Sequence, residues 1–459
     1  MSSTSTISSI YFIGIGGIGM SALARYFKSR GAQVSGYDKT ETALTRALVN
    51  EGIAIHYHES LELIPKEVDV VVYTPAIPAH HAERVFYESN GYRVVKRSDI
   101  LQWITEHSFN ICVAGTHGKT TVSTMIAHLL RDSQYGCNAF LGGIAANYQT
   151  NFWSSEREVA VIEADEYDRS FLKLSPDIAV ITAVDADHLD IYGTPEEVEK
   201  AFVEFSGRLK PGGILIKQQG IASHIRFSTA ASVASVTYSG QSPLAQVYAT
   251  NIRVEAGTYH FDITGTSYAI QGLQLSMGGL HNIENAVAAV TVAHQLGISD
   301  DAIRSALANF KGVKRRFEYR IQTSEQVLID DYAHHPEELK ALITGVKSIF
   351  PGKPITLVFQ PHLFSRTRDL CTAFAASLDL ADEVILLPIY PARELPIEGV
   401  TSEMIRNHMK NEQVHIFSKA ECKTWIEQAQ PAVLVMAGAG DIDQLIQEIV
   451  NNHPSQTHA

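Results

Sequence analysis

The sequence predicts an α/β protein of three domains, each built on a largely parallel sheet, and three observations support this class. The chain has 459 residues, too many for one hydrophobic core at roughly 100–200 residues per domain. Short apolar runs alternate with helical patterns through successive cycles, as in parallel sheets covered by helices. Two glycine-rich runs, at 11–27 and 111–126, each lie between an apolar run and a helical pattern. We therefore expect domains at 1–108, 109–316 and 317–459.

Composition excludes several classes of protein. Hydrophobic residues make up 45% of the chain and charged residues 19%, as in ordinary globular proteins. No apolar run approaches the ~20 residues that cross a bilayer, so we expect no membrane span. The formal net charge of −13 disfavours nonspecific nucleic-acid binding, which needs a basic surface. The N-terminal "MSSTSTISSI" has neither the basic region nor the apolar core of an export signal, so we expect a cytoplasmic protein.

In the first cycle, "SIYFIGI" predicts a strand and "MSALARYFKSRG" the helix that follows it. Gly14, Gly16 and Gly19 satisfy the pattern G-x-G-x-x-G, and Asp38 follows the next apolar run, at "VSGYD". This combination is the dinucleotide fingerprint, in which glycines let the backbone approach a pyrophosphate at a helix N-terminus. Taken alone, it predicts a Rossmann-like domain in an NAD-dependent oxidoreductase. A UDP-sugar carries the same pyrophosphate and would use the same loop.

The second cycle opens with "ICVAGTHGKTTVSTMI", a strand, a tight loop and an amphipathic helix. Only Thr116 and His117 separate Gly115 from Gly118, so the spacing is shorter than in the usual phosphate loop, G-x-x-x-x-G-K-[ST]. The order of strand, loop and helix still predicts a phosphate site, where backbone N–H groups and Lys119 bind phosphate oxygens. The alternative is a glycine turn before a helix that threonine caps.

Acidic residues follow the next strand pattern, in "VIEADEYDRSFL". A cluster of carboxylates is costly unless a cation compensates it, and Mg²⁺ bound to ATP needs oxygen ligands. Glu163, at the end of the strand, is therefore the best candidate for a Mg²⁺ ligand among these acids, and Thr120 could place its hydroxyl on the same ion. "ITAVDADHLDIYG" adds His188, which could complete a second metal site or contact a reacting phosphoryl group. A satisfied structural histidine is the alternative.

Two further features complete the central region. From about 210 to 275, short β-rich runs separated by turn residues predict strands added to the central sheet. Asn282 and Asn285 then precede a helical pattern. Their amides could read an adenine edge, or they could cap the helix.

The third cycle supplies positive charge near strand ends. "QPHLFSRTRDL" contains His362, Arg366 and Arg368. Arginine binds carboxylates and phosphates through two hydrogen bonds, so this spacing predicts a clamp for an anion; an exposed charged helix start is the alternative. Other candidates lie after the preceding strand and at the domain junction: Asp331, His334, His335 and Arg316.

Together these motifs resemble the Mur ligase family of peptidoglycan synthesis. The blocks that carry the resemblance run from about residue 9 to 441: "GIGGIGMS", "VYTPAIP", "GTHGKTT", "EADEYDRSFL", "DADHLDIYG", "HNIENA", "DDYAHHPEE", "QPHLFSRTRDL" and "YPAREL". The resemblance implies an N-terminal Rossmann-like domain for a UDP-sugar, a central P-loop ATPase-type parallel sheet with added β strands, and a C-terminal Rossmann-like domain for an amino acid. It also implies that ATP, with Mg²⁺, converts a carboxylate into an acyl phosphate that an amine attacks.

The resemblance is greatest to the branch that joins L-alanine to UDP-N-acetylmuramate, and it implies a role for each matching residue. Those near the reacting groups are Lys119, His188, Arg366 and Arg368. Those that bind ATP are Gly115, Thr116, His117, Gly118, Lys119, Thr120, Thr121, Asn282, Asn285, Arg316 and Asp331. Those that bind the UDP-sugar are Gly14, Gly16, Gly17, Gly19, Asp38, Thr74, His334, His335 and His362. The metal ligands are Thr120, Glu163 and His188.

Three alternative functions remain at this point. Within the family, a recycling branch attaches a tripeptide to the same UDP-sugar. Outside it are an NAD-dependent oxidoreductase and a noncatalytic nucleotide-binding module. Many relatives also carry a carbamylated lysine after the metal-binding histidine, and Lys200 lies in that neighbourhood. We interpret Lys200 as a surface residue of a helix.

Overall fold

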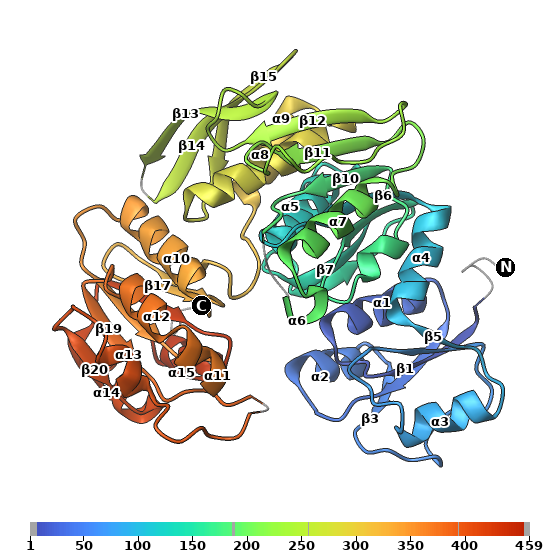
Figure 1. Cartoon of the computed structure of the whole chain (residues 1–459), viewed down its shortest axis with the longest axis horizontal. Coiled ribbons are helices and arrows are strands. Elements are labelled where there is room, and N and C mark those ends of the chain that lie inside the picture. The colour runs from blue at the N-terminus through green and yellow to red at the C-terminus, as the bar shows by residue number, and fades with distance from the viewer. Residues whose placement is uncertain (1–6, 186–188, 256, 393, 454–459) are drawn as a thin grey trace. The chain divides into compact units, whose positions relative to one another are not determined.

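The computed structural model describes residues 7–185, 189–255, 257–392 and 394–453, and its elements form three sheets (Figure 1). The N-terminal sheet has the order β3-β2-β1-β4-β5, and all its strands are parallel. Its strands are β1 Ser9–Ile13, β2 Gln33–Tyr37, β3 Ala54–His56, β4 Val70–Tyr73 and β5 Val94–Lys96, and its helices are α1 Ile18–Ser29, α2 Ala43–Asn50, α3 Ala82–Ser89 and α4 Arg97–His107. The strand order reverses between β1 and β4, which is where ligands bind in open α/β sheets.

The central sheet has ten strands in the order β15-β14-β13-β12-β11-β10-β6-β9-β7-β8. Strands β7, β9, β6, β10, β11 and β12 run parallel, and β8 closes one edge antiparallel to β7. The strands are β6 Phe109–Ala114, β7 Asn138–Ala145, β8 Thr150–Trp153, β9 Val159–Glu163, β10 Ile178–Ile181, β11 Ile214–Gln218, β12 Ala234–Ser239, β13 Val247–Glu255, β14 Thr258–Gly265 and β15 Ala269–Leu275. The helices are α5 Lys119–Asp132, α6 Leu189–Tyr192, α7 Pro195–Ser206, α8 Leu280–Gln295 and α9 Asp300–Asn309, with a 3₁₀ turn at Ser170–Lys173. The added strands that the sequence predicted are present.

The C-terminal sheet has the order β16-β17-β21-β18-β19-β20. Only its edge strand β16 is antiparallel to its neighbour among the described strands. The strands are β16 Glu318–Gln322, β17 Val327–Asp331, β18 Ile355–Phe359, β19 Glu383–Leu386, β20 Val414–Ile416 and β21 Val433–Ala437. The helices are α10 Pro336–Ile349, α11 Phe364–Asp369, α12 Cys371–Leu378, α13 Ser402–Arg406, α14 Lys419–Ala429 and α15 Ile442–Asn452. The predicted α/β class with three largely parallel sheets is thus confirmed.

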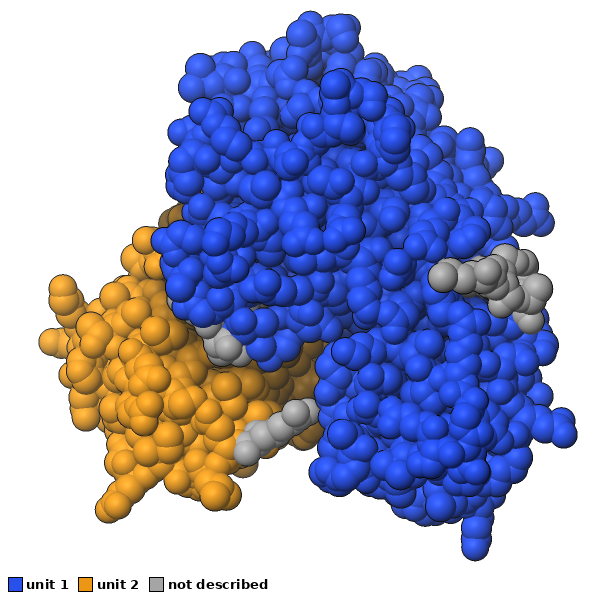
Figure 2. All heavy atoms as spheres, turned by 45° about the vertical axis from the view of Figure 1, so that its right-hand side comes forward, with its two compact units in different colours: residues 1–251, 261–273, 284–310 blue, residues 252–260, 274–283, 311–459 orange. Residues whose placement is uncertain are grey.

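The chain divides into two compact units (Figure 2). The first contains residues 1–251, 261–273 and 284–310, and the second contains 252–260, 274–283 and 311–459. The N-terminal sheet belongs to the first unit because α1 packs against β7 and β8 of the central sheet. The predicted domain limits at 108/109 and 316/317 stay predictions. No helix of the described residues has the length and apolar character that a membrane span requires.

A polar contact fixes the packing of α1 inside the first unit. Arg25 of α1 has an 8% exposed side chain and donates to the side-chain oxygen of Asn151, on β8. Its Nε and Nη2 also donate to the carboxylate of Glu51. A buried guanidinium is tolerated only when it is paired in this way. The two glycine-rich loops are therefore carried by one packed body.

Candidate functional site

The loop between β6 and α5 has the backbone that a phosphate site needs. Gly115 has φ +143° and Gly118 has φ +81°, conformations that favour glycine. A Cβ at Gly115 would collide with the hydroxyl of Thr182, and one at Gly118 would lie 3.0 Å from the amide oxygen of Asn285. The side chains of Thr182 and Asn285 therefore pack closely against the loop and fix its short form. These contacts hold the loop in place although it is shorter than the usual phosphate loop.

Lys119 begins α5, and its ammonium group lies back over the loop. Nζ donates to the carbonyl of Gly115 at 2.6 Å and to Oε1 of Glu166 at 2.7 Å. The Lys119 side chain is 14% exposed, whereas that of Glu166 is 1% exposed. Burial raises the pKa of the Glu166 carboxyl, and the charge of Lys119 opposes this rise. A cation at a helix N-terminus that follows a glycine-rich loop is suited to binding phosphate.

Oxygen donors gather beside this loop. Thr120 Oγ1 donates to Oε1 of Glu163 at 2.9 Å, and the backbone N–H of Gly142 donates to Oε2 at 3.0 Å. A hydroxyl and a carboxylate in contact fit Mg²⁺, which prefers oxygen ligands and keeps several waters. Within the described ranges, no cluster of three or more His, Cys, Asp or Glu is arranged for a metal. The predicted ligand His188 lies outside the described residues.

Two threonines hold the other side of the loop. Thr116 Oγ1 donates to a carboxylate oxygen of Asp185 at 3.1 Å, and Thr182 Oγ1 donates to the carbonyl of His117. Thr182 is not among the residues predicted from the sequence. Its signal was its position directly after β10, whose carboxyl end lies next to that of β6 because the two strands are parallel neighbours. Thr121, the last residue of the predicted set in this loop, is buried in the first turn of α5.

The two predicted adenine contacts lie in the first turns of α8. Asn285 is 9% exposed and approaches Gly118, as described above. Asn282 is 3% exposed, and its amide donates to the carbonyl of Gly278 at 2.6 Å. Asn285 belongs to the first compact unit and Asn282 to the second. Asn285 therefore lies beside the phosphate loop of its own unit, and the contact of Asn282 with adenine stays a prediction.

The N-terminal glycine run forms a second loop suited to binding phosphate, at the end of β1. The backbone N–H of Gly16 donates to Oδ2 of Asp38 at 2.7 Å. A Cβ at Gly14 would lie 2.9 Å from Thr74, and a Cβ at Gly19 would collide with the guanidinium of Arg97. Gly17 is the N-cap of α1 and has no capping side chain, so N–H groups of the first turn remain available. The predicted residues of this loop thus lie together at the reversal of strand order.

In the second unit, predicted residues meet at the carboxyl ends of β17 and β18. The ring centroids of His334 and His362 are 6.0 Å apart, and burial lowers the pKa of both imidazoles. Nδ1 of His362 and Nη1 of Arg366 are buried and have no hydrogen-bond partner among the described residues. Buried polar atoms without a partner are costly, and Nη1 of Arg366 can only donate, so a ligand that accepts hydrogen bonds would be stabilised here. This end of the sheet is therefore a candidate anion site.

The remaining predicted residues of the second unit differ in their burial and in their contacts. Both oxygens of Asp331 accept backbone hydrogen bonds, from Phe317 at 2.7 Å and Ala333 at 2.8 Å, and burial raises the pKa of this carboxyl to about 6. Arg316 and His335 are exposed. Arg368 is exposed and pairs with its neighbour Asp369 at 2.8 Å. Lys200 is 71% exposed on α7 and pairs with Glu197, which confirms its interpretation as a surface residue.

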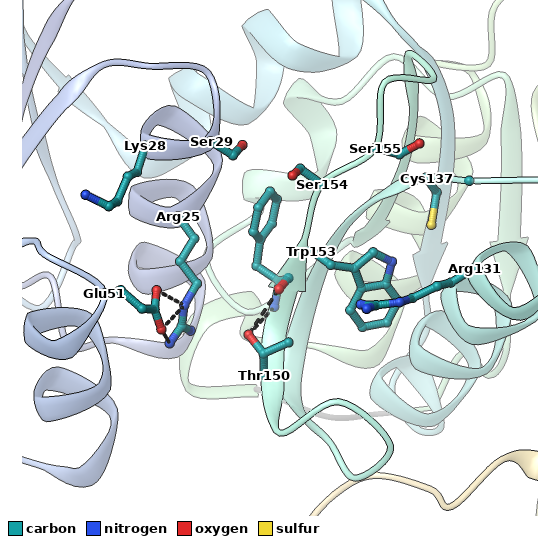
Figure 3. Close-up of a pocket in the computed structure, with 12 residues that line it drawn as sticks. Arg25, Lys28, Ser29, Glu51, Arg131, Cys137, Thr150, Trp153, Ser154 and Ser155 are labelled. Atoms are coloured by element: carbon teal, nitrogen blue, oxygen red, sulfur yellow. Dashed lines mark hydrogen bonds and ion pairs between the residues drawn. The ribbon is translucent and has the colours of Figure 1, made fainter. Parts of the chain in front are cut away.

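A cavity of about 810 Å³ lies elsewhere in the first unit, between α1 and β8. In Figure 3, Arg25 and Glu51 pair on one side of it, and the guanidinium of Arg131 lies near the indole of Trp153 on the other. Its lining residues are Arg25, Lys28, Ser29, Glu51, Arg131, Gly136, Cys137, Thr150, Phe152, Trp153, Ser154 and Ser155. No residue predicted from the sequence lines this cavity. The candidate site is thus identified by loop geometry rather than by a cavity.

Comparison with known proteins matches all three parts of the chain. Residues 9–109 match the model described as the catalytic domain of the Mur ligase family, residues 113–293 the Mur ligase middle domain, and residues 315–442 the Mur ligase glutamate ligase domain. The UDP-N-acetylmuramate–L-alanine ligase of Cytophaga hutchinsonii is 48% identical over 96% of both chains. That of Porphyromonas gingivalis is 47% identical over 95% of this chain and 97% of its own.

Solved structures agree with the sequence comparison. The crystal structure of a UDP-N-acetylmuramate–alanine ligase from Thermotoga maritima superposes with a TM-score of 0.82, at 28% identity, over 98% of this chain and 99% of the other. A murein peptide ligase from Psychrobacter arcticus superposes with a TM-score of 0.66 at 21% identity, over 97% and 99% of the two chains. The second likeness concerns the fold alone.

Proposed function

The chain belongs to the Mur ligase family, and on that premise we propose that it joins L-alanine to the carboxylate of UDP-N-acetylmuramate with consumption of ATP. The observation that carries this proposal is the 48% identity to an L-alanine ligase over 96% of both chains. The site geometry supports it, because one chain holds two separate loops suited to phosphate. A nicotinamide-dependent oxidoreductase needs only one such loop.

We assign the two loops to different substrates. The pyrophosphate of the UDP-sugar binds at Gly14 to Gly19, where the N–H groups at the start of α1 are uncapped. The phosphates of ATP bind at Gly115 to Thr121, and Lys119 contacts the terminal phosphates. The adenine lies toward Asn285, which adjoins Gly118 of the phosphate loop, and Asn282 stays the second predicted contact. In the second unit, His362, Arg366 and Arg368 hold the anionic groups of the substrates.

The reaction proceeds in two balanced steps. An oxygen of the substrate carboxylate attacks the γ-phosphorus, the bond to the bridging oxygen breaks, and ADP leaves. The neutral amine of L-alanine then attacks the acyl carbon, the bond from this carbon to the phosphate oxygen breaks, and inorganic phosphate leaves as the nitrogen of the new amide releases one proton to solvent. Negative charge spreads over the transferred phosphoryl oxygens in the first step, so a fixed cation such as Lys119 stabilises the transition state more than the ground state.

Mg²⁺ is part of the proposal. Thr120 and Glu163 are the described residues that would hold it, and their oxygen donors fit its preference. Bound there, the ion would neutralise phosphate charge. His188 is the predicted further ligand. We place the reaction in the cytoplasm, where ATP is supplied.

The glycine loop of the N-terminal sheet gives a direct test of this division of roles. A Cβ at Gly16 would lie 2.6 Å from Thr45 and 2.8 Å from the Asp38 carboxylate, so Gly16→Val must displace the loop. Overpacking costs about 1–3 kcal/mol, so we expect KM for UDP-N-acetylmuramate to rise about tenfold or more. KM for ATP, measured in the same steady-state assay, should change little. A loss confined to ATP would contradict the assignment of the two loops.

Phosphate release tests the proposed activity itself. It should require ATP, Mg²⁺, UDP-N-acetylmuramate and L-alanine together, and omission of any one should abolish it. The tripeptide of the recycling ligases is the comparison acceptor at the same concentration. Faster turnover with the tripeptide than with L-alanine would replace the proposal by that alternative.

A further inference from the structure

Lys119 has a partner to which neither its motif nor the proposed reaction assigns a role. This partner is Glu166, in the loop that follows β9, and its Oε1 accepts a hydrogen bond from Nζ at 2.7 Å. The Glu166 side chain is 1% exposed, so its charge is withdrawn from water almost entirely. A carboxylate this buried is stable only beside a cation. The pair is thus a fixed part of the loop and not a chance surface contact.

The position of Glu166 is itself held from two sides. Its backbone carbonyl accepts hydrogen bonds from the hydroxyl of Tyr192 at 2.6 Å and from the N–H of Arg169 at 2.9 Å. Tyr192 is 4% exposed, and the guanidinium of Arg169 lies over its ring at 4.8 Å. The residue therefore cannot move far without breaking buried contacts. Glu166 presents its carboxylate to Lys119 from a rigid support.

The contacts of Lys119 leave one donor for a ligand. An ammonium group has three N–H bonds. Glu166 and the carbonyl of Gly115 accept two of them within the part of the chain that the structure describes. Both acceptors belong to the protein, so they fix the torsions of a long side chain that would otherwise be mobile. The third N–H remains for a phosphate oxygen at the loop.

We propose that Glu166 is a positioning residue for the ligation: it holds Lys119 so that the remaining N–H points at the transferred phosphoryl group. The inference rests on the proposed function. In this proposal Glu166 contacts none of the three substrates and acts on the reaction through Lys119. The same arrangement operates in protein kinases, where a glutamate must pair with the phosphate-binding lysine for activity.

Glu166→Gln tests the proposal because it keeps the shape of the side chain and removes its charge. We expect kcat to fall about 10- to 100-fold, less than the loss expected when a preorganised donor is removed outright. KM for UDP-N-acetylmuramate should stay within about twofold of the wild type, since that loop is distant in sequence and role. Asp168→Asn, an exposed acid of the same loop, is the matched control and should keep wild-type kcat.

A double-mutant cycle separates positioning from mere structural support. Binding of a nonhydrolysable ATP analogue is measured by calorimetry in wild type, Glu166→Gln, Lys119→Met and the double variant. If Glu166 acts through Lys119, its replacement weakens binding in the wild-type background and has no effect in the Lys119→Met background. Equal losses in both backgrounds, or none in either, would overturn the proposal.

A second variant and a separate assay complete the test. If Glu166→Gln fails to fold, Glu166→Asp replaces it: the charge is kept, but the side chain is one methylene too short to reach Lys119, and the same loss of kcat is expected. Wild-type kcat for Glu166→Asp would contradict the positioning role. The proposed function is tested separately by the wild-type ligation assay, because analogue binding does not depend on which acceptor the enzyme uses.

Discussion

Lys119→Ala should abolish ligation. Lys119 is the cation at the phosphate loop, and its Nζ lies over that loop at 2.6 Å from the carbonyl of Gly115. Loss of a cation that stabilises transferred phosphoryl charge should reduce kcat about 10³-fold or more, equivalent to about 4 kcal/mol of transition-state stabilisation. Product formation from radiolabelled L-alanine is the measurement. UDP-N-acetylmuramate binding, measured by calorimetry, should persist because we assign that substrate to the other glycine loop.

The same substitution should also affect stability. It leaves Glu166 buried without its cation, and breaking a buried pair costs about 3–5 kcal/mol when the remaining charge stays ionised. Burial already raises the pKa of this carboxyl, so protonation should relieve part of the cost. Lys200→Ala is the matched control, since that lysine is 71% exposed on α7. Retained ATP-dependent ligation by folded Lys119→Ala protein would contradict the assignment of the loop.

Glu163→Gln should have the second-largest effect. Glu163 accepts from Thr120 at 2.9 Å and from the Gly142 N–H at 3.0 Å, so its position is fixed at the end of β9. Replacing its charge with an amide should lower kcat about 100-fold and raise the Mg²⁺ concentration that gives half-maximal rate. A Mg²⁺ titration of the steady-state rate measures both.

The control for Glu163 is the carboxylate at the other end of the same strand. Glu158 immediately precedes β9, is 59% exposed and pairs with Arg30 at 2.8 Å. Exposed pairs contribute little, so Glu158→Gln should leave the Mg²⁺ dependence unchanged. If the two variants gave the same Mg²⁺ titration as the wild type, Glu163 would have no role in holding the ion.

Local patterns predicted the sheets and the loops because these features are local. The alternation of apolar runs and helical patterns gives three sheets, and the glycines at 14, 115 and 118 occupy positive-φ positions that the motifs require. The same holds for where several candidate site residues lie, whereas their roles stay predictions. Residues adjacent to strand ends, such as Glu163 and Asp38, could be found because parallel strands end at one edge.

Contacts between distant segments could not be predicted in this way. The position of Thr182 after a strand marks it only as a residue at the sheet edge, and does not indicate that its hydroxyl touches a loop more than sixty residues earlier. The pairing of Glu166 with Lys119 likewise depends on β9 and β6 being neighbours in the sheet. The acid-rich run after β9 indicates that a cation lies nearby, but it does not indicate which cation. Which carboxylate meets the lysine and which meets Thr120 is decided by the packing of the strands.

The most direct test of the central claim follows the oxygen atoms of the substrate. UDP-N-acetylmuramate labelled with ¹⁸O in both carboxylate oxygens is incubated with the protein, ATP, Mg²⁺ and L-alanine, and the phosphate released is analysed by mass spectrometry. An acyl-phosphate route transfers one labelled oxygen to each phosphate and keeps the other in the amide. We expect one ¹⁸O in each phosphate released, and as many phosphates as amide products. Unlabelled phosphate, or phosphate release without amide, would contradict it.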